Sequence, residues 1–240
     1  MNIVLNQFMN NLLNNLINKL FKKKIKYHEI SRLLKPGDLF FDIGAHLGDK
    51  SKELIKNNIN VVMVEPQPSC LKKINKLYSN NPLVKIVPMG LGSFIGKMDM
   101  NINNETPVLS TFADHWKTGR FAESKWEEKI TISITTLDEL IKKYGFPNYI
   151  KIDVEGFEYE VLKGLSKKVG IISFEFTSEF FKDSEKCINY LISLGYEKFN
   201  FSLGEKKKFD LEWSNSEIII NKLKNYIKSD NLLWGDIYAM

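Results

Sequence analysis

Short apolar runs recur along the chain, and longer amphipathic stretches separate them. A short continuous apolar run is typical of a strand buried on both faces, whereas apolar residues at every third or fourth position indicate a helix that packs one face on a core. The alternation predicts an α/β fold. We expect strands over residues 38–43, 61–64, 84–87, 148–152, 171–176, 196–202 and 235–240, and helices over residues 49–57, 68–78, 136–144, 157–165, 184–194 and 214–228.

The middle of the chain has a different pattern. Residues 94–101 alternate loosely and suggest the arm of a hairpin, and residues 129–135 alternate again, which predicts a strand that returns the chain to the sheet. Residues 102–128, between them, show no clear period. Because a long irregular insertion in a compact chain is usually functional or disordered, we expect a substrate lid here, in which Trp116 could stack on a sugar ring.

The N-terminal residues carry apolar side chains at helical spacing, on a face that runs over residues 5–21. This spacing predicts a helical extension over residues 1–34 that packs on the core or on a second subunit, so a homo-oligomer is one expectation. A helix lying on a membrane surface is the other, which the asparagine-rich polar face disfavours. We expect residues 35–240 to form one domain, because they contain no repeat and no linker.

Composition narrows the possible partners and the compartment. The 240 residues carry 34 Lys and Arg against 29 Asp and Glu, and much of the excess lies in lysine runs that a solvated face explains, so no nucleic-acid partner is expected. Cys70 and Cys187 lack metal-ligand spacing and predict no disulfide framework, which favours a reducing, cytoplasmic compartment. No apolar run approaches the ~20 residues that span a bilayer, and the N-terminus lacks the early positive charge of a signal peptide.

Residues 39–48 contain the first candidate site. An apolar run passes abruptly into Asp-x-Gly-x-x-x-Gly, and helix-compatible residues follow. Glycines let the backbone approach a ligand closely, and the start of a helix offers unpaired N–H groups. The spacing is not the Gly-x-Gly-x-x-Gly of dinucleotide sites, and Asp42 suits a positively charged or hydrogen-bond-donating ligand. S-adenosylmethionine (SAM), with an ammonium and a sulfonium, meets that requirement. The expected contacts are Asp42, Gly44, Ala45, His46 and Gly48.

Two further segments would complete the cofactor pocket. Glu65, followed by Pro66, ends the second predicted strand about 20 residues after the glycine turn, where a carboxylate can accept both ribose hydroxyls of an adenosine. Gly90 and Leu91 follow the third predicted strand and could line the adenine pocket. An exposed carboxylate and a simple turn are the alternatives for these two segments.

The second informative stretch is Asn148–Gly156, a predicted central strand with two carboxylates at its end. Open parallel sheets bind ligands beyond the C-terminal strand ends, so Asp153 and Glu155 should face the same crevice as Asp42 and Glu65. Asp153 is also a candidate cofactor contact, because an acid here could hydrogen-bond the methionine end of SAM. Glu175 lies within an apolar run, where a carboxylate is costly unless it is paired, so it is a further site candidate.

These motifs resemble the FkbM family of SAM-dependent methyltransferases. The resemblance rests on Phe41–Gly48, Val64-Glu65-Pro66, Gly90-Leu91-Gly92, Thr136-Leu137-Asp138 and, most specifically, Ile150–Gly156, and it covers roughly residues 38–240. It implies a class I methyltransferase fold, with a seven-stranded, mostly parallel sheet whose last strand is reversed and with helices on both faces. It also implies methyl transfer to oxygen, commonly a hydroxyl of a sugar or polyketide.

The catalytic group stays open at this level. Asp153 and Glu155 are the leading candidates for a general base, and His115 from the insertion is a rival with a better intrinsic pKa. Asp153, Glu155 and Glu175 could instead hold a Mg²⁺-like ion that acidifies the hydroxyl. Other acceptors (lipid, polyketide, protein, or an RNA cap or ribose hydroxyl) and a noncatalytic SAM-binding module are the alternatives. An exocyclic-nitrogen methyltransferase of nucleic acids is disfavoured, because Asp-Val-Glu-Gly stands where Asn/Asp-Pro-Pro-Tyr/Phe is expected.

Overall fold

The computed structural model describes residues 32–118, 121–126, 128–204, 206 and 208–240. The expectations of an N-terminal helix and of an oligomer formed through it therefore fall almost wholly outside the described residues.

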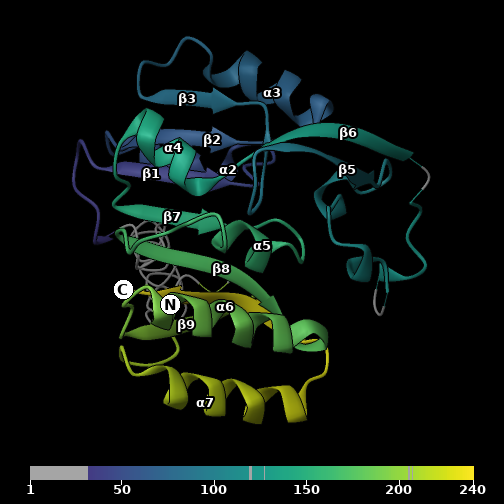
Figure 1. Ribbon diagram of the computed structural model, residues 1–240. Helices are drawn as coiled ribbons and strands as arrows, with labels where there is room; N and C mark the ends of the chain where they lie inside the picture. The colour runs from purple at the N-terminus through teal and green to yellow at the C-terminus, as the bar shows by residue number, and fades with distance from the viewer. Residues whose placement is uncertain (1–31, 119–120, 127, 205, 207) are drawn as a thin grey trace, which may run out of the picture.

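A seven-stranded sheet forms the centre of the domain (Figure 1). Its order is β3-β2-β1-β7-β8-β10-β9; β10 runs antiparallel to β8 and β9, and the pairs from β3 to β8 are parallel. This is the seven-stranded architecture with a reversed last strand that the sequence predicts, so the class I methyltransferase fold is confirmed. The strands are β1 (Leu39–Ile43), β2 (Asn60–Val64), β3 (Val84–Val87), β7 (Tyr149–Ile152), β8 (Ile171–Thr177), β9 (Phe199–Leu203) and β10 (Trp234–Ala239).

Helices cover both faces of this sheet. Successive side chains of a strand point to opposite faces, so Phe40 and Phe41 of β1 enter two different cores. One core receives apolar side chains from α2 (Asp49–Lys56) and α3 (Pro68–Tyr78). The other, larger core is covered by α4 (Leu137–Tyr144), α5 (Glu158–Leu162), α6 (Phe181–Ser193) and α7 (Ser216–Ser229).

The alternating segments in the middle of the chain form a second, three-stranded sheet of order β4-β6-β5. It contains β4 (Gly90–Leu91), β5 (Gly96–Ile102) and β6 (Glu128–Thr135). The expectation that residues 129–135 return to the main sheet is wrong, because β6 pairs with β5 along its whole length and with β4 at its end. The hairpin of β5 and β6 extends away from the main sheet (Figure 1), and the irregular insertion connects its two strands.

The insertion contains two short 3-10 helices, η2 (Pro107–Leu109) and η3 (Asp114–Lys117). A third, η5 (Ser178–Phe180), follows β8. Cys70 on α3 and Cys187 on α6 are both buried and free, as expected for a chain without a disulfide framework. Among the described helices, none has the length and apolar content that crossing a membrane requires.

A buried lysine lies at the centre of the sheet. Lys151 on β7 is paired in register with Asp42 of β1 and Ser173 of β8. Its ammonium lies 2.6 Å from the carboxylate of Asp153 and 3.8 Å from that of Asp236 on β10. Burial disfavours the charged ammonium, but the two carboxylates raise the Lys151 pKa well above its ordinary value. Lys151 therefore links the parallel strands electrostatically to the reversed strand β10.

Replacing this lysine should destabilise the domain in a pH-dependent way. Because the pKa of Lys151 is raised, its ammonium is charged, and its stabilising effect is fully present, at every pH below the ordinary lysine pKa. In Lys151→Met the half-buried carboxylates of Asp153 and Asp236 lose their counter-charge, which costs about 2 kcal/mol of unfolding free energy at neutral pH once partial solvent screening is included. The deficit should shrink as pH falls, because the carboxyl groups become protonated. Urea unfolding at about pH 5 and pH 8 measures both effects.

The matched control is Lys72→Met, which removes an exposed lysine of α3. Surface substitutions of this kind change stability by less than about 0.5 kcal/mol. A Lys151→Met deficit that is equal at both pH values would contradict the ionic role.

Candidate functional site

The glycine turn after β1 brings bare backbone to the carboxyl edge of the sheet. Gly44 has a φ of 78°, and a Cβ there would lie 1.8 Å from the carbonyl oxygen of Asp153, so only glycine fits beside the neighbouring strand. The N–H groups of Gly44 and Ala45 both donate to the carbonyl of Val64 at 3.0 Å. The turn is thus fixed between the ends of β2 and β7.

Glu65 anchors the same turn from β2. One carboxylate oxygen accepts the N–H of His46 at 2.8 Å, and the other accepts the N–H of Gln67, also at 2.8 Å. Burial raises the pKa of Glu65 to about 7, even though these N–H donors favour its charged form. Each oxygen has a further lone pair, so the carboxylate can still accept two more donors.

The turn opens into a cavity. Residues of the two strand ends line it, namely Gly44, Ala45, His46, Glu65 and Pro66. Apolar lining comes from Met89, Leu91, Met100 and Phe112, and Asp153 and Glu155 also line the cavity. We call this space the first cavity. It collects most of the residues that the sequence predicts for a cofactor site.

Asp42 and Gly48 are not among the residues that line the first cavity. The buried carboxylate of Asp42 accepts the hydroxyl of Ser51 at 2.5 Å and so attaches β1 to α2. Gly48 precedes α2 with a φ of 76°, and a Cβ there would press on Tyr78 at 2.9 Å. The structure gives both residues a part in shaping the turn, and a direct cofactor contact for them stays a prediction.

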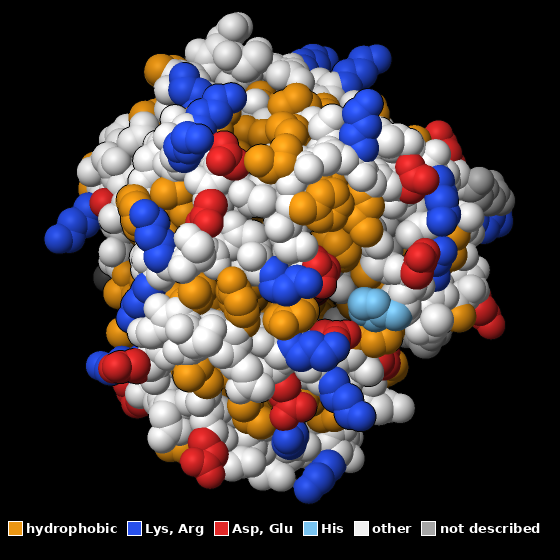
Figure 2. Space-filling view, in the orientation of Figure 1, with side chains coloured by type: hydrophobic (Ala, Val, Ile, Leu, Met, Phe, Trp, Pro, Cys, Tyr) orange, Lys and Arg blue, Asp and Glu red, His pale blue; other side chains and the backbone are white. Residues whose placement is uncertain are grey.

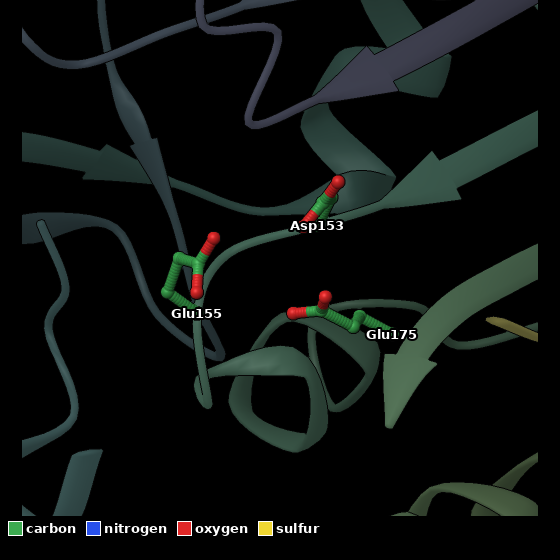
Figure 3. A group of neighbouring side chains, drawn as sticks. All are labelled: Asp153, Glu155 and Glu175. Carbon is green, nitrogen blue, oxygen red and sulfur yellow. The ribbon is translucent and has the colours of Figure 1, made fainter. Parts of the chain in front are cut away.

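Three carboxylates, two of which line the first cavity, lie close together. Asp153 and Glu155 lie in the loop after β7, Glu175 lies on β8, and their side chains point toward one another (Figure 3). One oxygen of each lies within 4.8 Å of an oxygen of the others, a separation that a single cation could bridge. The sequence predicts these three acids as one possible set of cation ligands, and in the structure their oxygens do lie close together.

The three carboxyl groups have different proton affinities. Burial raises the pKa of Asp153, but the ion pair with Lys151 outweighs it and leaves that pKa below its ordinary value. Burial raises the pKa of Glu155 well above its ordinary value, with further contributions from Asp153 and Glu158. Burial and the neighbouring acids do the same for Glu175. Asp153 is therefore the stable anion of the group, and the two glutamates hold protons more tightly.

Backbone geometry keeps Glu155 in place. Its φ is 56°, a left-handed conformation that is uncommon outside glycine, and Gly156 follows with a φ of 90°. Glu158, the first residue of α5, accepts the N–H groups of Val154 at 3.1 Å and Gly156 at 3.3 Å. The hydroxyl of Thr111 donates to the carbonyl of Glu155 at 2.6 Å, which ties the insertion to this turn.

The insertion covers the site but does not present Trp116 for stacking on a ligand. The indole is 3% exposed and packs against Phe121 and Phe180, with ring centroids 5.1 and 5.4 Å away. It also lies over Gly156, where a Cβ would be 2.6 Å from the ring. The expectation of a sugar-stacking Trp116 is therefore wrong, because the ring's faces are used in packing.

His115 lies apart from the carboxylates of the first cavity. Its Nε2 is 3.5 Å from Asp183 of α6, and its ring contacts Phe180 edge-on at 5.0 Å. It lines a second cavity of about 510 Å³ that Glu175, Thr177 and Trp116 also line. On the face shown in Figure 2, acidic and basic side chains lie interspersed with apolar ones. A catalytic role for His115 stays a prediction.

Several residues of this site were not singled out from the sequence. Lys151 was read only as part of a motif, although a lysine between hydrophobic strand residues is a signal of a buried ion pair. Glu158 lies in the predicted helix over residues 157–165, where an acid in the first turn is typical of a helix start. Thr111 and Thr177 carry no local signal, because tertiary packing alone places them.

Both the sequence and the structure of the chain resemble those of known proteins. The family model described as the methyltransferase FkbM domain matches residues 42–198. A curated relative, the hexuronic acid methyltransferase AglP of Haloferax volcanii, is 25% identical over 139 residues, which are 57% of this chain and 54% of that protein. The chain thus matches about half the length of this relative.

Solved structures resemble the chain more distantly. A precorrin-6y C5,15-methyltransferase from Geobacter metallireducens has a TM-score of 0.45 and 15% identity, over 86% of this chain and 81% of the other. A TehB-like SAM-dependent methyltransferase from Corynebacterium glutamicum has a TM-score of 0.43 and 13% identity, over 95% and 96%. At such scores nothing about the site is transferred from them.

The family match spans more than half of the chain and includes both motif regions, the glycine turn and the acidic loop after β7. The order of the main sheet agrees with it. The chain belongs to the FkbM methyltransferase domain family.

Proposed function

We propose that this protein transfers a methyl group from SAM to a hydroxyl group of a sugar or glycan. The observation that carries the proposal is the meeting of two features at one sheet edge. A bare-backbone turn anchored by a buried carboxylate lines the first cavity, and Asp153 and Glu155 also line it. The family supports methyl transfer, and the relative that is named for hexuronic acid supports a sugar.

The residues of the first cavity fit SAM chemically. Glu65 retains acceptor capacity for ribose hydroxyls, and the apolar lining of Met89, Leu91 and Phe112 suits an adenine ring. The anionic Asp153 suits a cationic ligand, because its low pKa keeps it charged. When bound, SAM supplies a methyl group on a positively charged sulfur, which keeps the bonding electron pair as the methyl carbon passes to the acceptor oxygen.

Glu155 is the general base of this proposal. It lines the first cavity beside Asp153, and its raised pKa makes it the stronger proton acceptor of the two once it is ionised. It would take the proton that the acceptor hydroxyl loses. Asp153 is less suited, because its ion pair with Lys151 stabilises the carboxylate and so weakens it as a base.

A divalent cation at Asp153, Glu155 and Glu175 is a second way to activate the hydroxyl. The spacing of the three oxygens is compatible with one ion. The Lys151 ammonium, 2.6 Å from Asp153, already neutralises one of these carboxylates and competes with a metal for it. We therefore assign the base role to Glu155. The experiment below also measures whether activity depends on a divalent metal.

Glu155→Gln should lower kcat by about 10²- to 10⁴-fold, because a positioned general base contributes this much, while the affinity for S-adenosylhomocysteine changes little. Wild-type kcat should rise with pH as Glu155 ionises, and the variant should lose that dependence. Transfer of labelled methyl from SAM to pools of nucleotide sugars and cell-surface glycans is measured, with RNA and protein as other acceptors. The assay is repeated with EDTA and with added Mg²⁺.

The matched control is Glu217→Gln, which removes an exposed carboxylate on α7. Full activity of Glu155→Gln would overturn the base assignment. Binding of S-adenosylhomocysteine without transfer to any acceptor would favour a noncatalytic module, and loss of activity in EDTA that Mg²⁺ restores would move the activating role to a metal.

Cofactor affinity should also depend on pH through Glu65. Ribose hydroxyls donate to the ionised carboxylate, so binding lowers a pKa that is about 7 in the free protein and releases a proton. Affinity for S-adenosylhomocysteine should therefore rise by up to about tenfold between about pH 6 and pH 8. Calorimetry in two buffers of different ionisation enthalpy measures both Kd and the released proton. Glu65→Gln should bind more weakly and without this pH dependence; an equal wild-type Kd at both pH values would contradict the ribose contact.

A further inference from the structure

The peptide unit that joins Glu155 to Gly156 is held at both of its ends. Its carbonyl oxygen accepts the hydroxyl of Thr111 at 2.6 Å, and its N–H donates to the carboxylate of Glu158 at 3.3 Å. The two partners come from different parts of the chain, the insertion and the first turn of α5. Because both bonds point along the same peptide plane, the peptide cannot rotate without losing them.

The turn needs this support because Glu155 has an unfavourable backbone conformation. Its φ of 56° lies in the left-handed region, which is costly for a residue with a side chain and persists only where the surroundings enforce it. The backbone before this residue is fixed by the end of β7. A change to a negative φ would therefore redirect the Glu155 side chain, so backbone conformation and carboxylate position are coupled here.

Thr111 is itself firmly attached to the hairpin. It is fully buried, and its backbone exchanges two hydrogen bonds with Asn101 of β5, at 2.8 and 2.9 Å. Its hydroxyl oxygen accepts the N–H of Ala113 at 2.9 Å, which leaves the hydroxyl proton for the Glu155 carbonyl. Thr111 thus connects the second sheet to the acidic loop through one side-chain hydrogen bond.

Glu158 holds the backbone on both sides of Glu155. It is 8% exposed, and the oxygen that accepts the Gly156 N–H also accepts the N–H of Val154 at 3.1 Å. Trp116 packs over the same turn, where a Cβ on Gly156 would lie 2.6 Å from its ring. Together these contacts leave the backbone around Glu155 little room to change its conformation.

We propose that Thr111 and Glu158 are positioning residues for methyl transfer, which hold the Glu155–Gly156 peptide so that the Glu155 carboxylate stays beside Asp153 at the first cavity (Figure 3). Both act through Glu155 and not on the reacting atoms. The inference rests on the proposed function, in which Glu155 is the general base. It gives the insertion a task besides covering the site, namely to fix the base.

The hydroxyl of Thr111 can be removed without changing the shape of the side chain. Thr111→Val should lower kcat at saturating SAM by about tenfold to a hundredfold, because a displacement of about 1 Å at a reacting group costs up to about 10²-fold. Thr111→Ser retains the hydroxyl and should keep most of the activity. Affinity for S-adenosylhomocysteine, measured by calorimetry, should change much less than kcat in both variants.

Glu158 is tested with a similar pair of variants. Glu158→Met removes both acceptor oxygens and should lower kcat as Thr111→Val does, whereas Glu158→Gln keeps one acceptor and should lower it less. The matched control is Thr131→Val, which removes an exposed hydroxyl of β6 that donates to Asp99, and it should leave kcat unchanged. Thermal unfolding shows whether each variant is folded at the assay temperature.

A double-variant cycle separates positioning from a general loss of structure. In the Glu155→Gln background the base is already absent, so Thr111→Val should lower kcat further by less than about twofold. A general structural defect would instead lower kcat by the same factor in both backgrounds.

An unchanged kcat in a folded Thr111→Val or Glu158→Met variant, or equal losses in the two backgrounds, would overturn the inference and leave the base role of Glu155 intact. Full activity of Glu155→Gln, or a wild-type protein that transfers methyl to no acceptor, would contradict the proposed function and this inference with it. The two failures are therefore distinguishable.

Discussion

The gathering of several carboxylates at one sheet edge is the constraint on which the rest of the structure depends. Asp153, Glu155, Glu158 and Glu175 lie within a few residues of strand ends that the main sheet brings together. The cluster is compatible with folding because each acid is stabilised in a different way. Lys151 forms an ion pair with Asp153, and Glu158 accepts backbone N–H groups. Glu155 and Glu175 have raised pKa values and so bind their protons tightly.

The same edge organises two cavities around these acids. The first is built from the glycine turn, which requires a glycine at position 44, and from Glu65, whose oxygens accept two backbone N–H groups. The second lies between the insertion, α6 and the end of β8. Because Thr111 bonds to the Glu155 carbonyl, the insertion and the acidic loop are mechanically connected.

Much of the fold could be predicted from the sequence. Buried parallel strands have short continuous apolar runs, and helices have apolar residues at every third or fourth position. Helix α3 and strand β3 have the predicted bounds, and the acidic loop lies where the strand-end argument placed it. The partner of residues 129–135 could not be predicted, because alternation identifies a strand without identifying its neighbour. For the same reason the burial of Trp116 was missed: its packing depends on Phe180 and Gly156, far away in sequence.

The central claim is that Glu155 has a raised pKa in the free protein and that binding of a cationic cofactor lowers this pKa. Side-chain carboxyl NMR of Glu155 tests it most directly, with the pKa measured in the free protein and with SAM or S-adenosylhomocysteine bound. The account predicts a pKa above the ordinary glutamate value in the free protein, a marked fall when the positively charged SAM binds, and a smaller change with the uncharged thioether of S-adenosylhomocysteine. An ordinary glutamate pKa in all three states would contradict it.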